Sequence, residues 1–169
     1  MIDPCDAPQS LVASTLTNQV YTITQDAIEF SFEAFSASPN WCKVSYSYST
    51  DNSEIKAALT FDEAALAFKF YQDDDLSLAG QTYTIQVHAE AGNLAREQAS
   101  GVILLEIREP CSNKDFIRIK SAPIASGLKY ALYAPQMHIV HDAFTIEALK
   151  PETVALCGDL VYTVTFNGV

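Results

Sequence analysis

An internal repeat sets the strongest limit on how this chain of 169 residues can fold. Cys5 recurs as Cys111, 106 residues later, and Cys42 recurs as Cys157, 115 residues later. Three short segments recur in the same order: DPC at 3–5 as EPC at 109–111, QDAI at 25–28 as HDAF at 141–144, and VSYSY at 44–48 as LVYTV at 160–164. The ordered agreement predicts two copies of one folding unit.

The repeat divides the chain into residues 1–108 and residues 109–169. We expect the first copy to be complete and the second to hold only the front half of the unit. Half of a β-sandwich would expose the inner faces of its strands and an unpaired edge. We therefore expect either that the chain is part of a longer tandem array or that another chain supplies the missing strands by β-augmentation.

The four cysteines allow three pairings, and the repeat selects the pairing within each copy, Cys5 with Cys42 and Cys111 with Cys157. No Cys-x-x-Cys pair occurs, which argues against a zinc site or a thioredoxin-like redox site. In the chain-entropy description each disulfide would contribute roughly 4 kcal/mol. Disulfides persist in oxidising compartments, so the expected location is extracellular or on the cell surface. Free, buried cysteines are the alternative.

Apolar and polar residues alternate with a period of two along most of the chain, which is typical of β-strands with one buried face. The runs end at Gly, Pro, Asn, Asp or Ser, and they lie at 28–33, 44–49, 83–90, 103–108, 117–120, 144–147 and 160–166. Six to seven strands in about 100 residues predict an all-β fold. We expect an antiparallel immunoglobulin-like β-sandwich followed by a second, incomplete copy.

The segment at 62–71 and the tryptophan at position 41 can each be interpreted in two ways. The segment DEAALAFKFY at 62–71 contains helix-favouring Ala and Leu, but its short length and its place between strand signals favour a strand, a turn and a strand. Trp41, the only tryptophan, is adjacent to Cys42 and is expected to cover the disulfide as a core residue. A ligand-stacking role for this ring is the alternative.

Composition excludes several classes of function. The net charge of −11 argues against a nucleic-acid binder and against docking on an anionic membrane. No apolar run approaches the roughly 20 residues that span a bilayer, so we expect no membrane insertion. The start at Met1 shows no signal peptide, which leaves a cytosolic protein or a piece of a longer chain.

The first copy resembles dystroglycan-type cadherin-like and immunoglobulin-like tandem repeats of extracellular proteins. The resemblance rests on AALTFD at 57–62, DDD at 73–75 and AGQTYTIQV at 79–87. The DPC opening is similar to that of large tandem-repeat surface proteins of microbial eukaryotes. This resemblance implies a surface or secreted location, disulfides and a structural or adhesive role. The second copy lacks the Gly-x-Tyr-Thr segment, and the acidic linker of true cadherins is absent.

Calcium is the best-supported metal, because it prefers carboxylate and carbonyl oxygens. The candidate ligands are acidic residues in one loop and at the boundary between the copies: Asp73, Asp74, Asp75, Glu106, Glu109 and Asp115, with Asn113 beside them. An ion at the boundary would stiffen it by neutralising crowded carboxylates. The simpler interpretation is that these residues form a solvated acidic surface.

Catalytic and sugar-binding patterns are weak. No Gly-x-Ser-x-Gly, phosphate-loop or His-Glu-x-x-His motif occurs, so we expect no enzyme. Most tyrosines fall on core-facing positions of the expected strands, which explains them by packing rather than by sugar stacking. The only sequon is the rare Asn-x-Cys type at Asn40, while O-glycans on Ser and Thr remain open.

These observations predict a non-enzymatic structural module of an extracellular or cell-surface tandem-repeat protein, which builds or decorates a filament or adhesive fibre. Glu109 and Pro110 join the copies without glycine, which favours a stiff junction. Expected partners are neighbouring repeats, copies of itself or other surface proteins. Two alternatives remain: a module that binds carbohydrate or a protein ligand, and a filament subunit completed by a strand from its neighbour.

Overall fold

The computed structural model of the chain describes residues 3–6, 10–93, 96–111, 113, 115–120, 144–158 and 161. The chain divides into two compact units, unit 1 at Met1–Glu109 and unit 2 at Pro110–Val169. Apart from Val161, the strand expected at 160–166 lies outside the described residues, as do Tyr130, Tyr133 and Tyr162. In the described part of the chain, no helix is long and apolar enough to cross a membrane.

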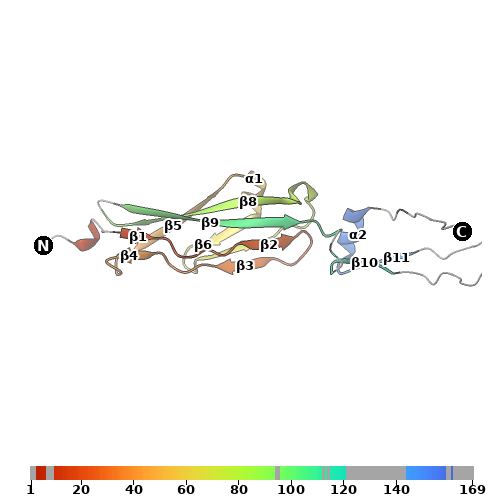
Figure 1. The fold of residues 1–169 in the computed structure, drawn as a ribbon, viewed down its shortest axis with the longest axis horizontal. Coiled ribbons are helices and arrows are strands. Elements are labelled where there is room, and N and C mark those ends of the chain that lie inside the picture. The colour runs from red at the N-terminus through yellow and green to blue at the C-terminus, as the bar shows by residue number, and fades with distance from the viewer. Residues whose placement is uncertain are drawn as a thin grey trace, which may run out of the picture. The chain divides into compact units, whose positions relative to one another are not determined.

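Unit 1 is an all-β sandwich (Figure 1). Its larger sheet has the strand order β2 (Gln19–Thr22), β9 (Glu97–Arg108), β8 (Gln81–Ala91) and β5 (Val44–Thr50). Its smaller sheet has the order β3 (Ile28–Ser31), β7 (Ala67–Phe70) and β6 (Leu59–Asp62). A separate short pair joins β1 (Ser10–Val12) to β4 (Ser36–Ser38).

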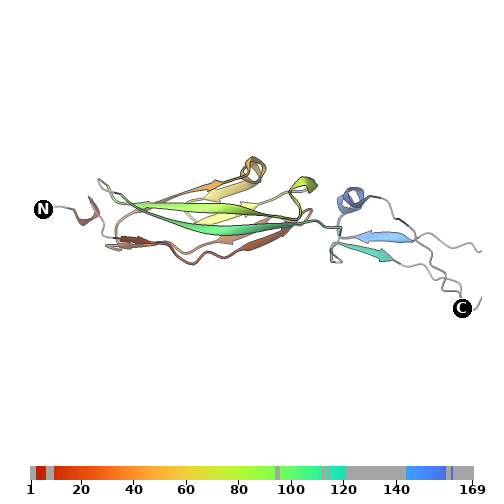
Figure 2. The ribbon, with the colours of Figure 1, turned by 45° about the horizontal axis from the view of Figure 1, so that its top comes forward.

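The expected alternation is confirmed by burial. In β8 the side chains of Tyr83, Ile85, Val87 and Ala89 are buried, and Ile103, Leu105 and Ile107 are buried in β9. The two strands pair antiparallel from Gln81 with Ile107 to Ala91 with Glu97, and Figure 2 shows them side by side. The pairs β1 with β4, β3 with β7, β5 with β8 and β6 with β7 are also antiparallel. One pair differs, because β2 runs parallel to β9.

An aromatic cluster joins the two sheets. Tyr48 of β5 lies across from Phe61 of β6 and Phe68 of β7, with ring centroids 5.7 and 5.4 Å away. Phe32 and Tyr46 extend the cluster, with centroids 5.7 Å apart. Edge-to-face and offset contacts of this kind add about 0.5–1.5 kcal/mol each to the burial of the rings. The apolar faces of the alternating strands therefore form one core within unit 1.

The segment 62–71 forms a turn between two strands, as the flanking strand signals predict. Asp62 accepts hydrogen bonds from the backbone N–H groups of Ala64 and Ala65, at 2.9 and 3.1 Å. Such Asx-type bonds favour a turn over a helix at this point. Strand β7 then returns beside β6, with Phe61 opposite Phe68.

Three short helical segments of unit 1 lie outside the alternating runs, and the alternation does not predict them. They are η1 (Pro4–Asp6), α1 (Ser53–Ala58) and η2 (Leu76–Leu78). The N-cap of α1 is Asn52, whose side chain accepts from the N–H groups of Glu54 and Ile55 at 2.8 and 2.9 Å. Ile55 is fully buried, so one turn of helix suffices to place an apolar side chain in the core.

The described part of unit 2 contains β10 (Ile117–Lys120) paired antiparallel with β11 (Thr145–Ala148), followed by α2 (Pro151–Cys157). The two strands correspond to the runs expected near 117 and 144. The helix was not expected. Pro151 lies at its start, where a fixed φ and a missing N–H are tolerated.

Candidate functional site

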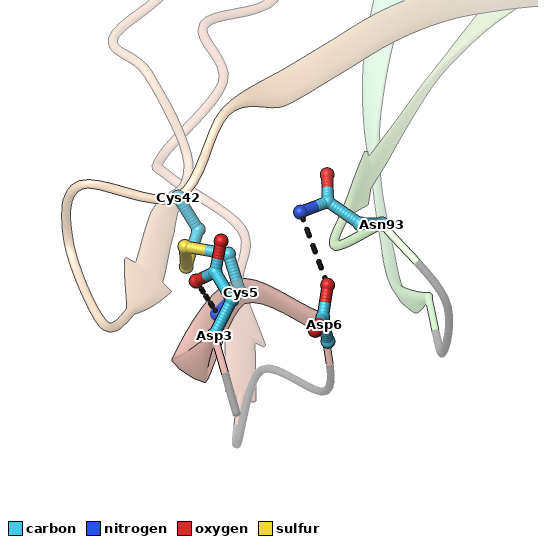
Figure 3. The surroundings of a disulfide bond; sticks show 5 residues. All are labelled: Asp3, Cys5, Asp6, Cys42 and Asn93. Atoms are coloured by element: carbon cyan, nitrogen blue, oxygen red, sulfur yellow. Dashed lines mark hydrogen bonds between the residues drawn. A yellow bond between two sulfur atoms is a disulfide. The ribbon is translucent and has the colours of Figure 1, made fainter. Parts of the chain in front are cut away.

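One end of unit 1 is closed by the disulfide between Cys5 and Cys42, whose Cα atoms are 5.3 Å apart. Cys42 is buried. Figure 3 shows the bond joining the η1 turn to the loop that precedes β5. The disulfide closes a loop of 37 residues that contains β1 to β4, and thus the start of both sheets.

Hydrogen bonds tie the same turn to the β8–β9 connection. The Oδ1 atom of Asp3 accepts from the backbone N–H of Cys5 at 2.9 Å (Figure 3). The backbone N–H of Asn93 donates to the carbonyl of Cys5 at 2.9 Å, and its side-chain amide reaches Asp6 at 3.5 Å. The disulfide and Asn93 thus connect three segments that are distant in sequence.

Unit 2 carries a second disulfide with the same arrangement. Cys111 and Cys157 lie 5.3 Å apart at Cα and close a loop of 46 residues. In both units a Pro-Cys step comes first, a short strand follows, and the partner strand precedes the second cysteine. The described residues contain no free cysteine. These are the two pairings that the internal repeat selects. That unit 2 is a true second copy stays a prediction.

Trp41 does not cover the disulfide, and the expectation of a core tryptophan is wrong. Its side chain is 71% exposed, whereas that of the adjacent Cys42 is 5% exposed. The N–H of Cys42 donates to the carbonyl of Pro39 at 3.2 Å, which closes a turn around Asn40 and Trp41. Burial of the cysteine sulfur within this turn leaves the neighbouring ring on the outside.

The candidate calcium ligands are not gathered by the structure. Among the described residues, no three His, Cys, Asp or Glu side chains form a group that could hold a metal ion. The Oδ1 atom of Asp75 caps η2 by accepting from the N–H of Ser77 at 2.9 Å, while Asp73 and Asp74 are exposed. Glu109 is also exposed in unit 1, and Asp115 is exposed in unit 2. A calcium site stays a prediction without support from these positions.

Glu106 is engaged by a neighbour on its own strand. Arg108 donates to both of its carboxylate oxygens, at 2.7 and 3.1 Å. This contact lowers the pKa of Glu106 and raises the pKa of Arg108. Both side chains are substantially exposed, so solvent screens the ion pair and it contributes little to stability.

The outer face of the larger sheet carries a polar groove of about 400 Å³. Its lining comes from three neighbouring strands: Ser47 of β5, His88, Ala89 and Glu90 of β8, and Gln98, Ala99 and Ser100 of β9. Sequence analysis did not predict this groove. The polar residues of the alternating runs could have indicated it, because their serines and His88 share one face of the sheet.

Two hydrogen-bonded groups hold the polar side chains of this face in place. Ser49 Oγ lies 2.9 Å from Nε2 of His88. The carboxylate of Glu90 accepts from Arg96 and from the amide of Gln98, each at 2.8 Å. These two hydrogen bonds lower the pKa of Glu90, that of Arg96 having the larger effect. Glu90 is therefore an ionised acceptor of fixed orientation at neutral pH.

No protein-family model matches this sequence, and no curated protein matches it. Solved structures with a similar fold include two cadherin repeats of a human mucin-like protocadherin, with 9% identity and a TM-score of 0.46. That match covers 61% of this chain and 53% of the other, so this chain spans about half of that structure. Another is the third cadherin domain of human protocadherin 7, with 14% identity and a TM-score of 0.41. It covers 64% of this chain and 91% of that domain.

A third similar structure is a SusE-like surface polysaccharide-binding protein of Bacteroides thetaiotaomicron, with 14% identity and a TM-score of 0.43. The match covers 67% of this chain but only 17% of that protein. At such identities and TM-scores, these neighbours say nothing about what this chain binds.

Proposed function

We propose that this chain is a non-enzymatic, disulfide-closed β module of an extracellular or cell-surface protein, with a structural or adhesive role. The observation that carries the proposal is the presence of one disulfide in each unit, in the same position relative to a short pair of strands. Disulfides are rare in reducing compartments, so two of them in a chain of 169 residues indicate an oxidising environment.

The position of the first disulfide suits a module that bears load. It fixes the beginning of unit 1 to the loop before β5, while Asn93 fixes the same turn to the β8–β9 connection. A loop of 37 residues gives a stabilisation of about 4 kcal/mol in the chain-entropy description. That is a large part of the roughly 5–15 kcal/mol that stabilises a typical domain.

The test is a disulfide map of the chain exported to an oxidising compartment, followed by equilibrium unfolding. Peptide mass mapping without reductant should show Cys5 linked to Cys42 and Cys111 linked to Cys157. The Cys5→Ala/Cys42→Ala double variant should lose about 4 kcal/mol of unfolding free energy in unit 1. The Cys111→Ala/Cys157→Ala variant is the matched control and should leave unit 1 unchanged.

Two results would contradict the proposal. Recovery of all four thiols free after export would remove the argument for an oxidising location. Linkage of an early cysteine to a late one would show that the two units do not close independently.

A further inference from the structure

We propose that the groove across β5, β8 and β9 binds a neutral, hydroxyl-rich saccharide. This inference goes beyond the structural role and does not depend on the disulfides. It rests on four observations: the cross-strand register, the hydroxyls left without protein partners, the prearranged carboxylate and the balance of charge.

The register places complementary polar side chains in rows across three strands. Ser47 lies opposite His88, and His88 lies opposite Ser100. In the next row, Ser45 lies opposite Glu90, and Glu90 lies opposite Gln98. Neighbouring strands are about 4.8 Å apart, and like-facing residues along one strand are about 7 Å apart. The rows therefore form a regular grid of hydrogen-bonding groups across the three strands.

Small residues leave space between these rows. Serines flank His88 on both sides, and no residue of the groove lining carries a ring larger than imidazole. The volume of about 400 Å³ lies within the roughly 300–1,000 Å³ of small-molecule sites. One or two sugar rings would occupy it.

Several polar groups in the groove are available to a ligand. Within the described part of the chain, the hydroxyls of Ser47 and Ser100 bond to no other protein group. A serine hydroxyl both donates and accepts, and Nδ1 of His88 remains beside the Nε2 atom that already bonds Ser49. Sugar hydroxyls have the same dual character, whereas a purely anionic or cationic ligand uses only half of these groups.

Glu90 is the anchor of the site. Arg96 and Gln98 hold its carboxylate at 2.8 Å each, so its orientation is set before a ligand arrives. An ionised carboxylate has about four acceptor positions, and two remain for ligand hydroxyls. Hydrogen bonds to a charged acceptor are about twice as strong as neutral ones.

The balance of charge selects a neutral ligand. Arg96 pairs with Glu90, which leaves the groove without excess positive charge. The chain as a whole carries a net charge of −11 and repels sulfated or carboxylated glycans. A neutral oligosaccharide needs no positive charge in the groove, and the negative charge of the chain does not repel it.

The experiment is a titration of the full chain, followed by amide ¹H–¹⁵N NMR. The probes are cellohexaose, laminarihexaose, mannohexaose and maltohexaose, with a heparin hexasaccharide as the charged comparison. At least one neutral hexasaccharide should give saturable shifts confined to the amides of β5, β8 and β9 near the groove. No saturable shift with any neutral probe, shifts centred on Trp41, or stronger binding of heparin would each overturn the proposal.

Variants separate the groove from general surface effects. Ser100→Tyr fills the groove and should weaken binding at least tenfold. Thr60→Tyr is the matched control, because it adds the same ring to an exposed strand position of the other sheet, and binding should be unchanged. Glu90→Gln keeps the shape but removes the charge and should weaken binding several-fold. Equal affinities for all four proteins would contradict the proposal, and unchanged far-UV spectra would confirm that each variant folds.

Discussion

Tyr21 illustrates how much one side chain contributes to the fold of unit 1. Its ring is fully buried against Phe70, with centroids 4.9 Å apart. Its hydroxyl accepts from the N–H of Gln72 at 3.0 Å and lies 2.7 Å from the carbonyl of the same residue. The hydroxyl therefore joins β2 to the loop after β7. The alternation in the sequence identifies a buried tyrosine but not the partner of its hydroxyl.

Burial raises the pKa of Tyr21 to about 12 from an ordinary value of 10.0, because the phenolate form is poorly solvated. The unfolded chain then loses this proton near pH 10, while the folded chain keeps it until about pH 12. Stability from this group is complete below pH 10 and falls as the pH rises to about 12. Urea unfolding at pH 8, 10 and 11.5 should show this decline.

The Tyr21→Phe variant should lose roughly 1 kcal/mol at pH 8, because the partly buried N–H of Gln72 loses its acceptor. It should also show a shallower decline at alkaline pH. Tyr71→Phe is the comparison at an exposed position: burial is the larger cause of the raised Tyr21 pKa and the charge of Tyr71 a smaller one, so this variant should change the slope much less than Tyr21→Phe. An equal slope for Tyr21→Phe and the parent would show that another group causes the decline.

At the scale of elements, α1 shows why a search for alternating apolar and polar residues does not predict short helices. The helix covers only Ser53–Ala58, which is too short to give a helical pattern of its own. Asn52 begins it by accepting two backbone N–H groups, and Ile55 anchors it in the core. The sequence shows Asp51, Asn52 and Ser53 as turn residues, and capping residues and turn residues are of the same types.

Asn52→Ala should lower the unfolding free energy of unit 1 by about 1 kcal/mol, because it removes the side-chain acceptor at the N-cap. Asn52→Asp is the matched variant, since aspartate caps equally well, and its stability should stay within a few tenths of a kcal/mol of the parent. Chemical denaturation with fluorescence detection measures both. Equal losses for the two variants would show that the amide nitrogen, rather than the cap oxygen, matters.

Strand β5 lies at the edge of the larger sheet, and an acidic side chain protects part of that edge. The backbone N–H of Tyr46 donates to the Oε1 atom of Glu63 at 2.9 Å, so an acidic side chain occupies part of the open edge. A charged group at an edge discourages pairing with another strand. The serines of β5 therefore present a polar face without also offering a free edge at this position.

At the scale of the molecule, the chain forms two units, each with its own disulfide. Each unit should therefore open separately. In hydrogen–deuterium exchange, the Cys111→Ala/Cys157→Ala variant should lose protection in β10, β11 and α2 while unit 1 stays protected. The Cys5→Ala/Cys42→Ala variant should show the reverse. Loss of protection throughout the chain in either variant would show that the two units stabilise each other.

The sequence by itself determined the fold class of unit 1, the strand–turn–strand at 62–71 and the pairing suggested by the repeat, because these follow from local periodicity, turn chemistry and spacing along the chain. Only the tertiary structure decided the exposure of Trp41, the parallel pairing of β2 with β9 and the groove over Ser47, Glu90 and Ser100. Each of these depends on which strands become neighbours and in what register. Residues far apart in sequence make that choice together, so no local pattern contains it.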